Sequence, residues 1–183
     1  MKKIFQKAFL FVATMTLSLG FASCSDDDDP VTEGNVVPAT ELSAVANTYV
    51  NDIINPTYKD LRDYAKDLKD ACDKAYANAK AGNLSDADIT AACEAFKNAR
   101  REWERSEAFL YGAAANNEID PHIDSWPLNR TLLHSYFATG KFSDAALEDA
   151  SILGFHALEF ILFRDGQPRK VAEFKGNDTY NGF

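Results

Sequence analysis

The sequence predicts an all-α protein, an up-and-down bundle of about five helices. After residue 38, apolar residues recur at steps of three and four, which is the period of an amphipathic helix. No segment alternates between apolar and polar residues for long enough to indicate a strand. Glycines and prolines divide the periodic region into pieces of helical length, which completes the pattern of a bundle.

Two helices are predicted on either side of Pro56. The first ends near Asn55-Pro56, because the residue before a proline disfavours helical geometry, and Pro56 suits the first turn of the second helix. Gly82 is expected to end the second helix. The apolar stripes are Leu42, Val45, Ala46, Tyr49, Val50, Ile53 and Ile54 on the first helix and Leu61, Ala65, Leu68, Cys72, Ala75 and Ala79 on the second.

A third helix is predicted from a Ser85 cap to Gly112. Two charged residues interrupt its apolar stripe. Arg100 has a long stem that can carry its charge to water, but Glu107 lies in line with the apolar residues and needs a reason to face inward. The stripe consists of Ile89, Ala92, Cys93, Phe96, Arg100, Trp103, Glu107 and Leu110.

The remaining elements are a loop and two helices. Breakers predict a loop over residues 113–125, and Trp126-Pro127 opens a short helix that Gly140 ends. The last helix is expected from Asp144 to about Arg164, stopped by the run Asp165-Gly166-Gln167-Pro168. The helical domain is therefore placed at residues 39–166 and an irregular tail at 167–183.

The first residues indicate export and lipid attachment. Residues 1–23 combine three lysines with an apolar stretch too short to span a bilayer, as in a signal peptide. Small residues precede Cys24, which resembles a bacterial lipobox, so Cys24 is the predicted lipidation site. Residues 24–38 form an acidic, flexible linker whose aspartates resemble a cell-surface export tag. The expected location is the outer membrane or cell surface, with the periplasmic face as the alternative.

Charge narrows the choice of partners. Removing the signal peptide leaves 160 residues, enough for one domain, and lowers the formal net charge from −9 to −12. An acidic chain of this kind argues against nucleic acid as a partner and is compatible with a cation.

Of the three cysteines, Cys72 and Cys93 lie near the same level of a predicted helical hairpin, which leaves both a disulfide and two buried thiols open.

His156 and Glu159 are the candidate functional pair. They are three residues apart in the otherwise apolar run 151–163, so a helix places both side chains on one face. An imidazole and a carboxylate suit iron, manganese or zinc better than calcium. A structural ion pair explains the same spacing. The peptidase motif His-Glu-x-x-His is absent, and Phe160 occupies the position that its inverted form requires for histidine.

Three motifs together resemble the imelysin family, also called the M75 peptidase or insulin-cleaving family. They are Gly154-x-His156-x-x-Glu159, the run Trp103-x-x-Ser106-Glu107-Ala108-Phe109-Leu110-Tyr111-Gly112, and the run Ile123-Asp124-Ser125-Trp126-Pro127-Leu128. The resemblance covers about Leu42 to Gly166. It implies one bundle of a two-bundle helical fold about twice this length, and a relation to iron-regulated proteins and iron-uptake components.

The resemblance also implies a site. His156 and Glu159 match the family's metal ligands, with Glu107 as a candidate third, and the metal is a divalent transition ion, iron or zinc. Trp103, Ser106, Asp124 and Trp126 match positions that line the same cleft, and Gly154 is expected to let a neighbouring helix approach.

The sequence therefore predicts a lipid-anchored protein that binds a transition metal for uptake or sensing, with a protein of an iron-uptake system as a further partner. The alternatives are a metallopeptidase of the M75 type and a metal-free helical binding module.

Overall fold

The computed structural model describes residues 37–174. The chain divides into two compact units, Met1–Ser43 and Ala44–Phe183, and the first is described only at residues 37–43. The predicted signal peptide, Cys24 and most of the predicted linker lie outside the described residues. The described part of the second unit, residues 44–174, is all-α apart from one very short hairpin, as the sequence predicted. Within the described residues, no helix is long and apolar enough to cross a membrane.

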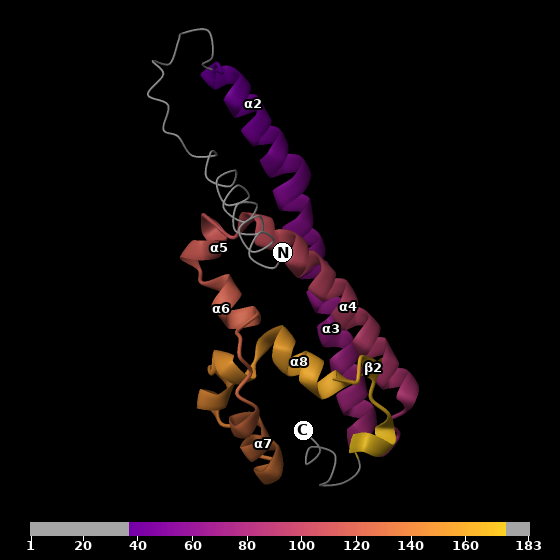
Figure 1. Cartoon of the computed structure of the whole chain (residues 1–183). Coiled ribbons are helices and arrows are strands. Elements are labelled where there is room, and N and C mark those ends of the chain that lie inside the picture. The colour runs from indigo at the N-terminus through magenta and orange to yellow at the C-terminus, as the bar shows by residue number, and fades with distance from the viewer. Residues whose placement is uncertain (1–36, 175–183) are drawn as a thin grey trace, which may run out of the picture. The chain divides into compact units, whose positions relative to one another are not determined.

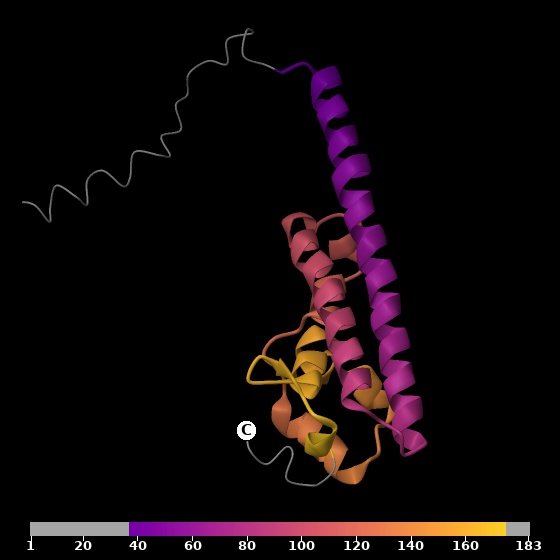
Figure 2. The ribbon, with the colours of Figure 1, turned by 90° about the vertical axis from the view of Figure 1, so that its right-hand side faces the viewer.

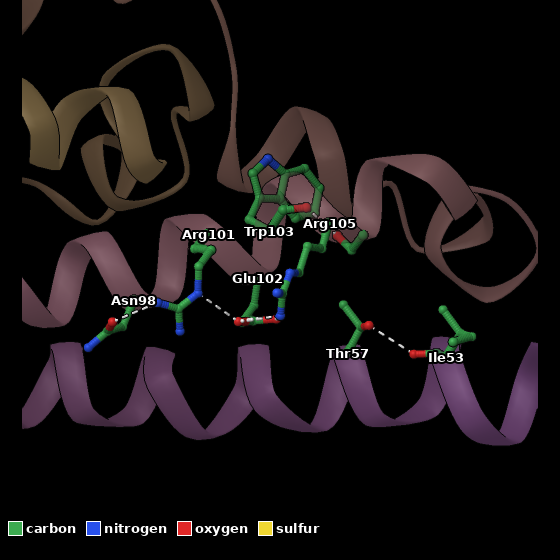
Figure 3. Close-up of polar contacts among 8 residues, drawn as sticks. Ile53, Thr57, Asn98, Arg101, Glu102, Trp103 and Arg105 are labelled. Atoms are coloured by element: carbon green, nitrogen blue, oxygen red, sulfur yellow. Dashed lines mark hydrogen bonds and ion pairs between the residues drawn. The ribbon is translucent and has the colours of Figure 1, made fainter.

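The expected break before Pro56 is absent. Helix α2 (Ala39–Tyr49) continues through a π-helical turn, η2 (Val50–Ile54), into α3 (Asn55–Lys80), with Pro56 in the first turn of α3. Proline lacks an N–H and its ring crowds the preceding turn, and the wider π turn relieves that conflict without ending the helix. The Thr57 hydroxyl donates to the Ile53 carbonyl at 2.8 Å across this junction (Figure 3).

Helices α3 and α4 (Asp86–Ser106) form a tightly packed antiparallel hairpin (Figure 1). Gly82 has a φ of +74° just after α3, and Ser85 and Asp88 form a reciprocal capping box at the start of α4, so the predicted stop and cap are both confirmed. The core of the hairpin continues onto later elements and includes Leu61, Leu68, Ile89, Ala92, Cys93, Phe96, Ala99 and Trp103. Figure 2 shows the two helices side by side from a second direction.

One buried carboxylate is held on α4 by two arginines. Glu102 is only 2% exposed, and its carboxylate accepts hydrogen bonds from Arg101 and Arg105 at about 3.0 Å each (Figure 3). Burial alone would raise the pKa of Glu102, but these two guanidinium groups outweigh it and lower the pKa. This charge is therefore satisfied within the hairpin.

The segment after α4 is more helical than the predicted loop. It contains η3 (Glu107–Phe109), α5 (Ala113–Asn116) and α6 (Ile119–Ile123). Helix α7 (Arg130–Thr139) starts later than Trp126-Pro127, because the Asn129 side chain caps it by accepting from the Leu132 N–H at 3.1 Å. Gly140, with a φ of +64°, ends α7 as predicted.

The predicted helix from Asp144 to Arg164 is wrong in its first half. The structure has η4 (Asp144–Leu147), η5 (Ala150–Ile152) and then α8 (Gly154–Leu162). The Asp149 carboxylate accepts from the Ser151 N–H at 2.9 Å, and Leu153 is extended before Gly154 at a φ of +77°, so the helix restarts at Gly154.

Residues beyond Gly166 return to the hairpin. The strands β1 (Phe163–Arg164) and β2 (Gln167–Pro168) pair around Asp165-Gly166, both at positive φ, which is the turn that Asp-Gly favours. In η6 (Val171–Phe174), Val171 is buried and its N–H donates to Asp86 at 2.8 Å. Structured packing therefore continues past the boundary expected at residue 166.

Cys72 and Cys93 are free thiols in this structure. Cys93 is fully buried, and its Sγ lies 3.5 Å from the Leu162 carbonyl. Burial raises the pKa of the Cys93 thiol to about 11. The thiol therefore stays protonated and helps to pack α8 against α4.

Candidate functional site

His156 lies between two carboxylates. Its Nε2 is 3.2 Å from Oδ1 of Asp124, and its Nδ1 is 3.7 Å from Oε2 of Glu159, one turn further along α8. The side chain of His156 is 20% exposed and that of Glu159 is 60% exposed. Because a carboxylate only accepts, the contact with Asp124 favours the tautomer that carries its proton on Nε2. The lone pair of Nδ1 then faces Glu159.

Asp124, at the end of α6, is the centre of the polar network. Its side chain is 7% exposed, its Oδ2 accepts from the Trp103 indole at 2.7 Å, and its Oδ1 is paired with Arg100. Burial alone would lower the pKa of Arg100, but Asp124 and Glu104 outweigh it and raise the pKa. Asp124 thus accepts hydrogen bonds from two side chains of α4 and contacts His156 of α8, and this ties the imidazole to the hairpin.

Gly154 allows this arrangement by bringing α8 against α6. A Cβ on Gly154 would lie 2.4 Å from the backbone oxygen of Ile123 and 2.7 Å from its carbonyl carbon, which is closer than such atoms can approach. Ile123 immediately precedes Asp124. The close approach that the sequence predicted for Gly154 therefore sets the distance between Asp124 and His156.

The other predicted site residues are placed differently. Trp126 is 73% exposed, and its ring centroid is 4.7 Å from that of His156, so it does lie beside the pair. Trp103 and Ser106 are fully buried instead of lining a cleft, and the Ser106 hydroxyl donates to the Trp103 carbonyl at 2.7 Å. Both residues of the Trp103-x-x-Ser106 motif lie in the last turns of α4, which are buried, so they pack beneath the site and do not face a cleft.

Glu107 does not face the core. The helix tightens to 3₁₀ geometry at η3, which rotates Glu107 off the stripe of Trp103 and leaves it exposed. Loss of solvent around its carboxylate, followed by the charge of Glu104, raises the pKa of Glu107. Among residues 37–174, no group of three or more His, Cys, Asp or Glu side chains is arranged to hold a metal, so Glu107 is not gathered with His156 and Glu159.

Arg100 and Glu104 belong to the network although the sequence analysis gave them no role in the site. Arg100 Nε is 2.6 Å from Oε1 of Glu104, and its guanidinium lies 5.4 Å from the centroid of the buried Phe155 ring. The signal was present, because Arg100 interrupts an apolar stripe. Its partner Asp124 is 24 residues away in sequence, and that pairing depends on the path of the irregular segment.

The described residues form the α3–α4 hairpin and a short helix, α8, that packs against it and carries the His-x-x-Glu pair. These features are those of a helical-bundle protein of the imelysin type. The imelysin (peptidase M75) family model matches residues 54–181, and the chain belongs to this family.

Named relatives connect the family to iron. The chain is 30% identical over 120 residues to iron-regulated protein A of Synechococcus elongatus, covering 66% of this chain and 31% of that protein. Two crystal structures are similar in fold. One, an imelysin peptidase from Bacteroides ovatus, is 36% identical with a TM-score of 0.61, and the match covers 72% of this chain and 39% of that one. The other, from Parabacteroides distasonis, is assigned as an iron-regulated protein A precursor; it is 34% identical with a TM-score of 0.69, covering 81% and 41%. The chain thus spans less than half the length of each relative.

Proposed function

We propose that this protein binds a divalent transition metal, iron or zinc, through His156 and Glu159, for uptake or sensing. One observation carries the proposal: Asp124 occupies Nε2 of His156, which leaves Nδ1 facing the largely exposed Glu159 carboxylate at 3.7 Å. A carboxylate on the far nitrogen of a histidine is the usual outer partner of a metal-bound imidazole, because it fixes the tautomer and raises the basicity of the ligand. The residues present therefore fit a metal with one nitrogen and one oxygen ligand.

Metal loading of the chain of residues 1–183 tests this assignment. Cys24→Ser removes the predicted lipid acceptor so that the protein can be handled in solution. After chelation and reloading with Fe²⁺ or Zn²⁺, we expect one ion per wild-type chain and affinity at least about tenfold lower in His156→Ala and in Glu159→Ala. Asp165→Asn, which removes an exposed charge nearby, is the matched control and should bind normally. Equal metal content in all four proteins would contradict the proposal.

The polar network provides a second test. Asp124→Asn should weaken metal binding by about tenfold, because an amide no longer selects the Nε2–H tautomer as strongly. If the pair is purely structural, His156→Ala should lower the melting temperature and the metal should shift no melting curve. That result would favour the metal-free binding module.

A metallopeptidase would in addition need a carboxylate free to activate water. Asp124 already accepts from Arg100 and Trp103 and contacts His156, and Glu159 is the metal ligand that we propose. Because both carboxylates already have partners or a role, we favour metal binding over peptide hydrolysis. Metal-dependent cleavage of an unfolded protein, abolished by Glu159→Gln, would reverse this preference.

We further propose a lipid anchor on Cys24 and a location at the outer membrane or cell surface, where the domain would pass metal to a protein of an iron-uptake system. The lipobox-like residues before Cys24 support the anchor. Labelling with a radioactive fatty acid, followed by membrane fractionation, should show a lipid on the wild type and none on Cys24→Ser. Equal labelling of both would contradict it.

A further inference from the structure

A cleft next to the site has walls of aromatic rings. This cleft of about 690 Å³ opens beside His156 and Glu159 and is lined by Phe96, Trp126, Phe160 and Phe163. Phe96 and Phe163 hold each other at a centroid distance of 5.3 Å and form a fixed part of the wall. Clefts of several hundred cubic ångströms with apolar walls are typical of small-molecule sites.

Trp126 makes this cleft unusual. Trp126 is 73% exposed, and its ring centroid lies 4.7 Å from that of His156. Leaving a large indole in water forgoes the stabilisation that burial would provide. An exposed aromatic at the wall of an apolar cleft offers a face on which a flat ring can stack.

One exposed cation at the wall of the cleft, Arg130, can receive an anionic group. Three cationic side chains line the cleft, Lys97, Arg130 and Arg164, against the two acids Glu159 and Asp165. Lys97 pairs with Glu94 at 2.8 Å and Arg164 pairs with Glu173 at 3.4 Å, so the charges of these two cations are balanced by neighbouring carboxylates. Arg130, the first residue of α7, is exposed.

We propose that this cleft binds a flat aromatic compound that carries a carboxylate or similar anionic group. The ring stacks against Trp126 and the phenylalanine wall, and the anion is held by Arg130. This inference rests on the cleft and not on the metal. It goes beyond the proposed function because the ligand is an organic acid and binds with or without an ion at His156.

Calorimetry with 2-naphthoate as the probe tests the proposal on the Cys24→Ser chain of residues 1–183 in excess chelator. We expect one saturable site, with binding at least about tenfold weaker for the neutral 2-naphthylmethanol, because it lacks the charge-assisted hydrogen bonds. Arg130→Gln should reduce naphthoate affinity about tenfold and leave naphthylmethanol unchanged, whereas Trp126→Ala should weaken both. Arg62→Gln, an exposed arginine of α3 outside the cleft, is the matched control.

Each outcome decides a separate claim. Equal affinity for the two naphthalenes would overturn the anionic ligand, and no saturable binding up to millimolar naphthoate would overturn the site. Circular dichroism confirms that each variant is folded, and the exposure of Trp126 and Arg130 predicts that both are. Repeating the wild-type titration with Zn²⁺ in place of the chelator separates the two proposals, because an ion at His156 should leave naphthoate affinity within about threefold of the value in chelator.

Discussion

The α3–α4 hairpin and the segment from Glu107 to Leu162 are built on different principles. The hairpin consists of long regular helices with a capping box, a glycine stop and a continuous apolar stripe. The segment consists of short helical pieces joined by turns, and its position is set by contacts with α4 through Asp124 and Gly154. The hairpin is thus a scaffold stabilised by many interchangeable contacts, whereas the geometry of the site depends on a few contacts that have no substitute.

Among these substitutions, Gly154→Ala should lower the free energy of unfolding the most. The new Cβ would lie 2.4 Å from the Ile123 oxygen, so α8 must move away from α6, in addition to the strain of a φ of +77°. We expect a loss of about 3 kcal/mol in the free energy of unfolding by urea.

The control for this prediction is Gly140→Ala. Gly140 also has a positive φ, +64°, but nothing lies within 4 Å of its added Cβ. It should therefore lose only about 1 kcal/mol. Similar losses at the two glycines would show that backbone conformation and not close approach sets the cost at Gly154.

Trp103→Phe tests the link between the two regions and should have the next largest effect. It keeps an aromatic ring in the core but removes the indole N–H that donates to Asp124 at 2.7 Å. We expect about 2 kcal/mol of lost stability, since a hydrogen bond to a buried charge is among the stronger kind. Trp126→Phe, at a 73% exposed position, should change the free energy of unfolding by less than about 0.5 kcal/mol. A larger loss at Trp126 would mean that it packs the fold.

The same contrast explains what the sequence could predict. Ser85, Gly82 and Gly140 act through their immediate neighbours, so their roles follow from local spacing. The stop before Pro56 and the helix from Asp144 were predicted wrongly, because a π turn at one place and an Asp149 side-chain bond at the other altered the backbone without changing the apolar period.

At the site, the spacing of His156 and Glu159 placed both on one helix face, but the partners came from elsewhere. Asp124 reaches His156 across 32 residues and Arg100 across 24, and only the folded path of α5 and α6 brings them together. The Asp165-Gly166 pair is also a local signal, since it both stops a helix and forms the turn of the β1–β2 hairpin. Glu107 shows the opposite failure, since a continued α-helical period predicted an inward position that the 3₁₀ turn removed.

Ser85→Ala tests whether a change in the hairpin alters the site. It removes the cap of α4, in which the Ser85 side chain accepts from the Asp88 N–H at 3.3 Å and donates to its carboxylate at 2.6 Å. Thermal unfolding should show a loss of about 1 kcal/mol. Metal affinity should stay at the wild-type value, because the capping pair bonds to Asn78 and not to His156 or Asp124. A drop in metal affinity would show that the scaffold and the site are coupled.

Glu107→Gln should have the smallest effect, and its sign is informative. Desolvation and Glu104 raise the pKa of Glu107 in the folded state, so ionisation opposes folding. The penalty is absent below the unfolded pKa, grows as pH rises through the folded pKa, and is fully present at neutral pH. Since the residue is exposed and screened by solvent, the variant should be more stable by only about 0.3 kcal/mol at pH 7 and equal to wild type near pH 3. Chemical unfolding at both pH values measures this difference.

Metal loading of the same variant separates two roles for Glu107. Unchanged metal affinity fits the exposed position of its side chain, whereas a clear loss would restore Glu107 as the third ligand that the sequence predicted.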